Sequence, residues 1–445
     1  MESGPGGEVP PRDGMLETAF GGAIGVYGAG WARRGGVSVT PFRLAAFRWL
    51  WCSTMASAEA QQMERTTTAW LALQTGGGAF AVGLVFAARS LPSLLFGLAA
   101  GTIADRADRR RQLLTVAGGA FSLMAILGWL VGAGTIRIWQ VIAISFAAGC
   151  VQVFDTPARQ ALVLDTTSRG AAPNAMALNA LAARLSGALG ALGAGALIPL
   201  IGVAHCYFVI AAGYGLMAAL ITALRVPQGS RVPVIHPPFG RALRDAARLI
   251  TAVPAVRTLI ISGIACEVFA FSYGSALPVV ARDVLRAGPG GLGTLNAAVS
   301  LGGTVALLLL SLLAGRVRRE PLIGVIFVAY GLSLMVLATT HDLRIAAAVL
   351  VVTGLCAGAF DVLQQTLIQM AVPEEQRGRA VGIWVLGVGS APVGNIEMGA
   401  LIATLGAPGA LLINGALAVA SAAMLLIRSP GYRWKWKQRA RPVAD

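Results

Sequence analysis

The most informative part of the sequence is a charged segment between two long apolar runs, which consists of Gly101-Thr102-Ile103-Ala104-Asp105-Arg106-Ala107-Asp108-Arg109-Arg110-Arg111. Gly101 permits close packing at the end of a helix. Asp108 is well placed to cap the helix that follows. Asp105 lies where its charge could complement the N-terminus of a neighbouring helix. A basic loop with a cap explains every feature except the spacing from Gly101 to Asp105.

The apolar runs on either side belong to a chain that is far too apolar for a soluble protein. Of its 445 residues, 56% are hydrophobic and 12% are charged, and the mean hydropathy is +0.71. A soluble domain would have about 25% charged residues. So much apolar side chain cannot be hidden in a water-soluble core, and lipid must cover much of it. The composition therefore predicts an all-α membrane protein.

Twelve apolar runs are long enough to cross a bilayer, which takes about 20 residues each. The runs lie near residues 44–74, 79–103, 112–134, 138–162, 174–200, 204–225, 257–282, 291–315, 321–339, 345–369, 379–403 and 408–427. Phe154-Asp155 in the first half matches Phe360-Asp361 in the second, at an offset of 206 residues (361 − 155). We therefore predict twelve transmembrane helices in two six-helix pseudo-repeats, with a binding site between them near the bilayer midplane.

These runs divide the chain into five parts. We predict a disordered cytoplasmic tail (1–41), an N-terminal six-helix bundle (42–225), a cytoplasmic linker with a short amphipathic helix (226–256), a C-terminal six-helix bundle (257–427) and a basic-aromatic cytoplasmic tail (428–445). The last tail alternates aromatic and cationic residues directly after a helix. That pattern favours an anchor to anionic lipid over nucleic-acid binding.

Arginine sets the orientation in the membrane. One set of loops is arginine-rich, and the other has only four arginines, Arg137, Arg282, Arg286 and Arg344. The rich loops should face the cytoplasm. We therefore expect a multi-pass protein of the cytoplasmic (inner) membrane with both termini in the cytoplasm. The net charge of +15 is then a consequence of topology, and we expect no nucleic-acid partner.

Several functions are excluded by residue types that are missing or dispersed. The only lysines are Lys435 and Lys437 in the C-terminal tail, so no lysine is available for an internal P-loop. The five cysteines and three histidines have no metal-ligand spacing, and we expect no metal or cofactor. The sequence contains no pairing of a nucleophile with a base that would predict an enzyme. If the protein transports a solute, the energy must therefore come from a gradient or from a separate ATPase subunit.

Ionisable groups inside the apolar runs are candidates for the transport pathway, because each costs about 2.5–3.5 kcal/mol on insertion scales. In the first run, polar residues recur at spacings of 3 and 4 and share one helical face, which should line a cavity. These residues are Thr54, Ser57, Gln61, Glu64 and Thr68. Alternatively, Glu64 and the adjacent Arg65 belong to an ion pair between helices.

Further ionisable groups lie at membrane depth in other runs. Glu267 lies near the middle of the seventh run, where desolvation favours a neutral carboxyl that can bind and release protons. A structural hydrogen bond is the alternative. Arg89 and Arg184 either bind an anionic substrate or neutralise Glu64 and Glu267. Glu397 lies toward the outer side and is either a proton relay or part of an outer gate.

Together with three other motifs, the segment 101–111 resembles the signature of the major facilitator superfamily. The other motifs are Arg89-Ser90-Leu91-Pro92, Asp155-Thr156-Pro157-Ala158-Arg159-Gln160 and residues 373–379 (PEEQRGR). The combination is similar to the branch that includes the enterobactin exporter and drug and macrolide efflux proteins, over residues 42–428. Two departures are plain: Asp108 stands where the superfamily often has Gly, and residues 184–195 lack the Pro of the antiporter signature.

The resemblance implies alternating access driven by the proton gradient. It also implies a cytoplasmic latch between the halves that includes Asp105 and Arg109. We expect the latch to comprise Gly101, Asp105, Arg106, Arg109, Arg110, Asp155, Arg159, Asp361, Arg377 and Arg379. For Asp155, Arg159 and Asp361, which lie near the cytoplasmic ends of their runs, substrate contact is the alternative. The expected function is proton-coupled export of a siderophore, drug or secondary metabolite. Lipid or lysolipid transport, and a membrane sensor or assembly factor that transports nothing, are the alternatives.

Overall fold

The computed structural model describes residues 40–428 except 107, 169, 225–243, 245–247, 314–318 and 374–375. Within these ranges only the backbone is described at residues 40, 98–106, 320, 377–379, 386 and 427–428. The expected tails and most of the linker 226–256 therefore lie outside the described residues. Every regular element in the described part is helical.

The N-terminal half begins with a short 3₁₀-helix, η4 (Thr40–Arg43). Its longer elements are α1 (Ala45–Gln74), α2 (Gly78–Arg106), α3 (Arg109–Gly132), α4 (Ile138–Gln152), α5 (Asp155–Asp165) and α6 (Ala172–Ala223). Asp108 caps α3, because its side chain accepts hydrogen bonds from the backbone N–H groups of Arg110 and Arg111. The predicted run at 138–162 is broken into α4 and α5.

The C-terminal half begins with an interrupted helix. It comprises α8 (Pro254–Ala265), the π-helix η5 (Cys266–Phe271), α9 (Tyr273–Val279) and a second π-helix, η6 (Val280–Val284). The remaining elements are α10 (Gly288–Leu312), α11 (Arg319–Ala338), α12 (Leu343–Met370), α13 (Arg377–Val388) and α14 (Ala391–Arg428). In the described part of the chain, nine helical spans are long and apolar enough to cross a membrane.

Two of these spans are continuous in hydrogen bonding but turn sharply at a glycine. Gly202 in α6 has a φ of +79°, and Gly406 in α14 has a φ of +74°. Glycine adopts this left-handed conformation without the steric penalty that a Cβ imposes. α6 has 52 residues, more than twice the length that one bilayer crossing needs. The breaks fall in the gaps predicted between residues 200 and 204 and between 403 and 408.

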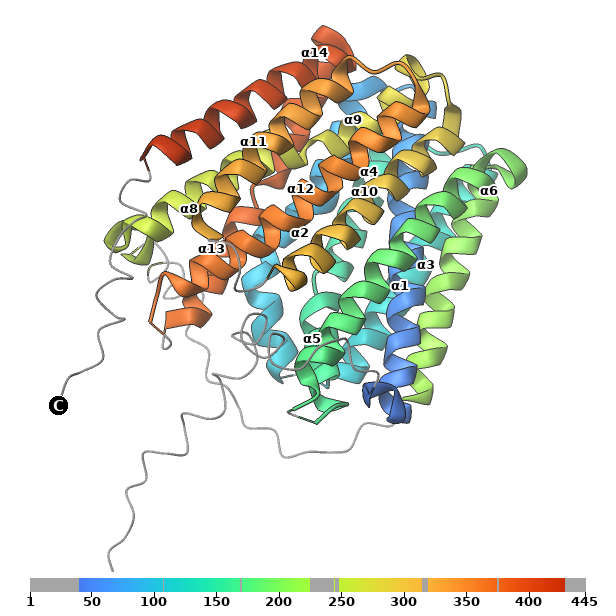
Figure 1. The fold of residues 1–445 in the computed structure, drawn as a ribbon. Helices are drawn as coiled ribbons and strands as arrows, with labels where there is room; N and C mark the ends of the chain where they lie inside the picture. Colours follow the sequence, from blue (N-terminus) through green and yellow to red (C-terminus); the bar gives the residue numbers. More distant parts are fainter. Residues whose placement is uncertain are drawn as a thin grey trace, which may run out of the picture.

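The two halves lean against each other and converge at one end (Figure 1). The main contacts across the boundary are α6 with α10 and α2 with α14. We call the end at which α1 finishes the converging end. The start of α1 and the helix α5 lie toward the opposite end in Figure 1.

Glycine pairs bring the backbones of the two halves into contact near the converging end. A Cβ on Gly83 of α2 would lie 2.5 Å from the carbonyl oxygen of Asn395 and 2.9 Å from Cα of Gly399 in α14. A Cβ on Gly293 of α10 would lie 2.6 Å from the carbonyl oxygen of Ala191 and 2.9 Å from Cα of Gly195 in α6. We call these contacts the α2–α14 seam and the α6–α10 seam. No larger residue fits in either seam as it stands.

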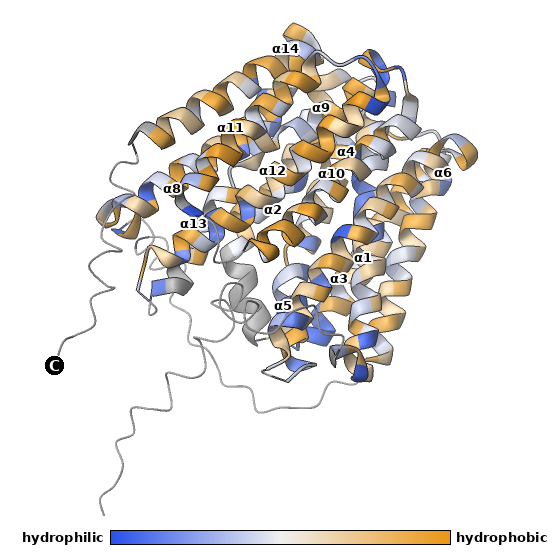
Figure 2. Cartoon of the chain, viewed as in Figure 1, coloured by the Kyte–Doolittle hydropathy of each residue, from blue (hydrophilic) through white to orange (hydrophobic). Residues whose placement is uncertain are grey.

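Hydrophobic residues predominate along most of the helices (Figure 2), and many large ones are exposed on the described surface. Large exposed examples are Leu200 at 77%, Leu312 at 69% and Trp129 at 66% of their possible exposure. A soluble monomer rarely exposes contiguous apolar patches on this scale. Together with the nine apolar spans, this surface identifies a multi-pass membrane protein.

Candidate substrate cavity

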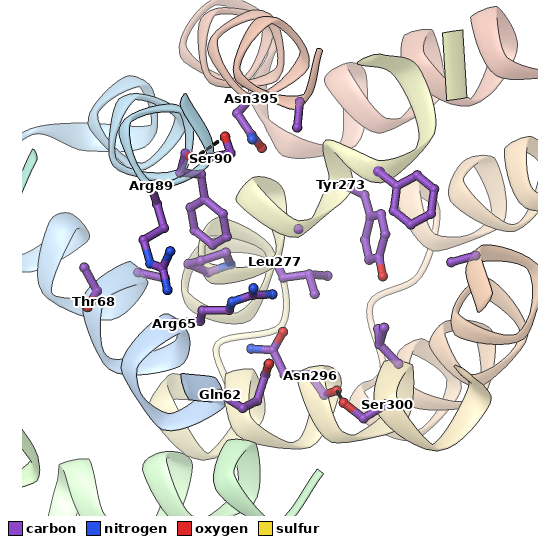
Figure 3. Close-up of a pocket in the computed structure, with 18 of the residues that line it drawn as sticks. Gln62, Arg65, Thr68, Arg89, Ser90, Tyr273, Leu277, Asn296, Ser300 and Asn395 are labelled. Carbon is purple, nitrogen blue, oxygen red and sulfur yellow. Dashed lines mark hydrogen bonds between the residues drawn. The ribbon is translucent and has the colours of Figure 1, made fainter. Parts of the chain in front are cut away.

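A cavity of about 510 Å³ lies between the two halves of the protein. The N-terminal half contributes residues of α1, α2, α4 and α6 to its lining, and the C-terminal half contributes residues of η5, α9, α10, α12 and α14. Figure 3 shows how these side chains surround it. Its ionisable lining residues are Glu64, Arg65, Arg89, Arg184, Tyr273, Glu267 and Asp361. Five of the residues predicted for the pathway are therefore brought together here.

Glu64 is held by two hydrogen bonds and is almost fully buried. Arg89 Nε donates to Oε1 of Glu64 at 3.1 Å, and the Tyr214 hydroxyl donates to Oε2 at 2.7 Å. The Tyr214 hydroxyl in turn accepts a hydrogen bond from Gln152 Nε2 at 2.8 Å. This network connects α1, α2, α4 and α6. Both carboxylate oxygens of Glu64 are thus occupied by groups of its own half.

Arg65, the next residue in α1, has a very different environment. Its side chain lines the cavity and is exposed, and in Figure 3 it extends into the central space on the same side as Asn296. Among the described residues, nothing forms a hydrogen bond or ion pair with its guanidinium group. Arg65 interacts electrostatically with Glu64, but Glu64 is already paired with Arg89, so Arg65 adds a net positive charge to this wall of the cavity.

Glu267 and Asp361 form the acidic wall of the cavity in the C-terminal half. Glu267 lies in η5, and a π-helical turn of this kind often occurs at functional sites. It interacts electrostatically with Asp361 of α12, and Asp361 interacts with Arg184 of α6 across the boundary. Within the described ranges, Glu267 has no hydrogen-bond partner.

Arg184 reaches this wall because α10 has a glycine beside it. A Cβ at Gly303 would overlap the Arg184 guanidinium group. The structure thus places Arg184 opposite Asp361. From the sequence we predicted that Asp361 belongs to the cytoplasmic latch.

Two predicted pathway residues do not line the cavity. Gln61 donates to Ser57 Oγ at 3.0 Å, within α1, and Gln62 lines the cavity beside it. Glu397 accepts a hydrogen bond from Asn414 Nδ2 at 3.0 Å, within α14. Both residues therefore lie away from the charged lining.

The described latch candidates on α3 and α5 contact the N-terminal half. Arg109 Nη1 lies 2.6 Å from a carboxylate oxygen of Asp165 in α5. Arg110 donates to the carbonyl oxygens of Ile221 and Thr222 at the end of α6. These contacts tie α3 to α5 and α6.

Asp155 and Arg159 form a buried ion pair at 2.8 Å. Arg159 also donates to the hydroxyl groups of Ser53 and Thr54 in α1. For the remaining latch candidates, the structure describes only the backbone. Gly101, Asp105 and Arg106 lie in the last two turns of α2, and Arg377 and Arg379 lie in the first turn of α13.

Two polar contacts link the halves near the converging end. Arg282 Nη1 donates to the carbonyl oxygen of Leu73 at 3.4 Å, and its guanidinium is also paired with Asp283 at 2.6 Å. Asn296 Nδ2 of α10 donates to Thr66 Oγ1 of α1 at 3.4 Å. These bonds connect the last part of α1 to the C-terminal half beside the two glycine seams.

Several polar residues of the site were not predicted from the sequence. Asn296 and Asn395 line the cavity, and Tyr214 and Gln152 hold Glu64 in place. Asn296 and Asn395 each stand in an apolar run, where an amide group is costly unless it is used. The cost of an amide group inside an apolar run could have identified both asparagines from the sequence. Tyr214 carries no such signal, because tyrosine is common in apolar helices.

A cavity between two packed halves of an all-helical membrane protein defines a membrane transporter. The profile of the family described as "Transmembrane secretion effector" matches residues 37–440, and the chain belongs to this family of major facilitator superfamily transporters. Its relatives place it in the drug and siderophore efflux branch of that superfamily, and these proteins are transporters, not enzymes.

Three curated relatives illustrate the branch. The multidrug efflux pump Tap of Mycobacterium tuberculosis is 25% identical over 86% of this chain and 92% of its own length. The staphyloferrin A transporter of Staphylococcus aureus is 22% identical over 74% of this chain and 82% of its own. Macrolide efflux protein A of Enterococcus faecalis is 24% identical over 66% of this chain and 92% of its own.

Solved structures agree with the fold. A POT family transporter in complex with a thioalcohol-conjugated peptide superposes with a TM-score of 0.71 at 11% identity, over 87% of this chain and 96% of that one. A bacterial homologue of the human lysosomal transporter Spinster, inward-facing and occupied, gives 0.69 at 14% identity, over 88% and 98%. At these identities the likeness concerns the fold alone.

Proposed function

We propose that this protein is a secondary active transporter that exports a small molecule across the cytoplasmic membrane by proton antiport and alternating access. The observation that carries the proposal is the cavity between the halves, whose lining includes Arg65 and Glu267, two ionisable groups with no hydrogen bond or ion pair among the described residues. Such groups are costly inside a membrane, and a scaffold that transports nothing has little reason to keep them. The names of the relatives favour a drug, a siderophore or a secondary metabolite as the substrate.

The number of membrane crossings in this proposal is twelve. Nine apolar spans are long enough to cross, and the spans that contain Gly202 and Gly406 each supply two crossings when divided at the glycine. α1 supplies the twelfth: it has 30 residues, and its lower hydropathy follows from the polar residues that line the cavity.

A regular offset between the halves supports two six-helix repeats. The two helix-breaking glycines are 204 residues apart (406 − 202). The starts of α4 and α12 are 205 residues apart (343 − 138), and so are the starts of α6 and α13 (377 − 172). The seam glycines Gly83 and Gly293 each lie five residues after the first residue of their helices, α2 and α10.

We infer from the arginine distribution that both termini are cytoplasmic and that the converging end faces outward. The structure then corresponds to an inward-facing state. In this state Arg109 and Arg110 are bound within their own half, as a released latch requires. Reporter fusions after residues 230 and 430 test the orientation, and a periplasmic signal at either position would contradict it.

Glu267 is the proposed proton carrier. A carrier has to change charge during the cycle, and no ion pair among the described residues holds the charge of Glu267. Asp361, Cys266 and Tyr330 are the ionisable groups that interact with it. Glu64 is a poorer candidate, because Arg89 and Tyr214 occupy both of its oxygens.

Uptake into inverted membrane vesicles tests the proposal. A labelled panel of siderophores, antibiotics and lysolipids is offered with and without an imposed pH gradient. We expect gradient-dependent accumulation of at least one small molecule. Accumulation of lysolipid alone would favour a lipid transporter. Normal membrane insertion without uptake of any compound would favour a sensor or assembly factor.

A further inference from the structure

The charges of the cavity are divided between its two walls. Among the acidic and basic residues of the lining, the N-terminal half contributes Glu64 and three arginines, and the C-terminal half contributes the carboxyl groups of Glu267 and Asp361. Glu64 and Arg89 form an ion pair and cancel each other. The wall of the N-terminal half is therefore positive, and the facing wall is negative whenever its carboxyl groups are ionised.

Part of the opposite charge on the two walls is neutralised by an interaction across the cavity. Arg184 and Asp361 interact electrostatically across the boundary between the halves. Arg65 on one wall and Glu267 on the other remain, and they form no ion pair with each other. Each is an ionisable group at membrane depth that lines the cavity and lacks a hydrogen-bond partner in the described part of the chain. A ligand with both signs of charge could satisfy both groups at once.

Apolar and aromatic side chains contribute to the lining beside its polar groups. Phe86 of α2, Phe271 of η5, and Tyr273 and Leu277 of α9 line the cavity. In Figure 3 Leu277 lies between Arg65 and Tyr273. This surface fits the body of an amphipathic molecule, because most drug-sized ligands are held by apolar and aromatic contacts and oriented by a few polar groups.

Proton antiport adds a thermodynamic condition, which rests on the function proposed above. The substrate and the proton must oppose each other's binding, and this effect is reciprocal. An anion at Arg65 alone does not displace a proton from Glu267. Its negative charge would instead favour protonation of the acidic wall. A cationic group beside Glu267 does oppose the proton, because it needs the ionised carboxylate.

We infer that the cavity takes an amphipathic zwitterion, with its acidic group on Arg65, its basic group on the Glu267–Asp361 wall and its aromatic body against Phe271 and Tyr273. The acidic group sets selectivity. The basic group takes the place of the exchanged proton. Arg65 is thus a specificity-determining residue, distinct from the proton carrier.

Three matched fluorescent probes test this inference on the purified, full-length protein. All share a naphthalene body, and they carry a primary amine, a carboxylate, or both. We expect the zwitterionic probe to bind at least about tenfold more tightly than either singly charged probe, since each charge-assisted bond contributes separately. Equal affinity for the three probes would overturn the inference.

Variants assign the two ends of the probe. Arg65→Gln should abolish the advantage of the zwitterion over the amine probe, and Glu267→Gln should abolish its advantage over the carboxylate probe. Arg344→Gln, a change to an exposed arginine outside the cavity, should do neither. Arg65→Lys keeps the positive charge and should retain part of the advantage of the zwitterion. Comparison of this variant with Arg65→Gln distinguishes a loss of substrate recognition from a loss of folding. An undiminished advantage in Arg65→Gln would contradict the assignment.

Proteoliposomes separate failure of this inference from failure of the proposed function. If an imposed pH gradient drives uptake of the zwitterion and Arg65→Gln reduces this uptake by more than about tenfold, both stand. If the gradient drives uptake of the amine probe equally well and Arg65→Gln has no effect, the transporter proposal stands and the zwitterion inference falls. If the gradient drives uptake of none of the probes or of the compound panel, the transporter proposal itself fails.

Discussion

Adding one methyl group to each glycine seam should force the converging end of the protein to open. In Gly83→Ala the new Cβ would lie 2.5 Å from the carbonyl oxygen of Asn395, and in Gly293→Ala it would lie 2.6 Å from that of Ala191. Comfortable contacts between heavy atoms are about 3.5–4.0 Å long. Both obstacles are backbone atoms, so each pair of helices has to separate by about 1 Å.

The expected size of the effect follows from the cost of overpacking. Forcing an extra carbon into a packed contact costs about 1–3 kcal/mol, and here that cost applies only while the seam is closed. The better helix propensity of alanine, about 0.8–1 kcal/mol, applies in every state and cancels. Each substitution should therefore favour the outward-open state by about 5- to 150-fold. The two seams lie on different helix pairs, so the double variant should combine both effects.

Spin labels measure this shift directly. Thr135→Cys and His341→Cys place exposed labels in the α3–α4 and α11–α12 connections, one in each half, in a protein whose five native cysteines are replaced. The double alanine variant should show a longer distance between the labels than the parent. Gly118→Ala is the control, because a Cβ there meets nothing within 4 Å. An unchanged distance distribution in the double variant would refute the role of the seams in closing this end.

Two other predictions concern charges near the end opposite the seams. Asp105→Asn should impair transport without affecting insertion, because it removes a latch charge at nearly constant side-chain size. Normal transport by this variant would indicate that residues 101–111 form a basic loop with a helix cap and no latch. Asp155→Asn should destabilise the protein by about 3–5 kcal/mol, because it leaves Arg159 buried and unpaired. Asp165→Asn removes the more exposed ion pair with Arg109 and should destabilise the protein by only about 0–1 kcal/mol. Thermal unfolding in detergent compares the two variants, and equal losses would argue against burial as the cause.

Most helices could be predicted from the sequence because their signal is long and continuous. The ends of α1, α10 and α12 lie within about three residues of the predicted runs. The breaks between α4 and α5 and between α13 and α14, and the π-helices η5 and η6, could not be predicted. These interruptions leave the hydrophobic pattern intact, and they depend on how neighbouring helices pack.

The candidate site could be predicted only in part. Of the five polar residues that the spacing in α1 placed on one face, Glu64 and Thr68 line the cavity, whereas Thr54, Ser57 and Gln61 do not. The periodicity does not fix the helix rotation closely enough to distinguish Gln61 from Gln62. The contrast between adjacent Glu64 and Arg65 depends on a partner 150 positions away, Tyr214. The glycine seams were hidden for a similar reason. The chain has 56 glycines, and only the three-dimensional pairing shows which of them meet.

If the cavity couples transport to protons through Glu267, the variant Glu267→Gln should be uncoupled. The substitution keeps shape and hydrogen bonding but fixes the charge at zero. In inverted vesicles the variant should lose accumulation driven by the pH gradient, yet still exchange labelled for unlabelled substrate. Glu59→Gln, an exposed carboxyl on α1 outside the cavity, should behave like the parent protein. Full gradient-driven accumulation in Glu267→Gln would contradict coupling through Glu267, and full accumulation in Glu64→Gln as well would place the proton route elsewhere.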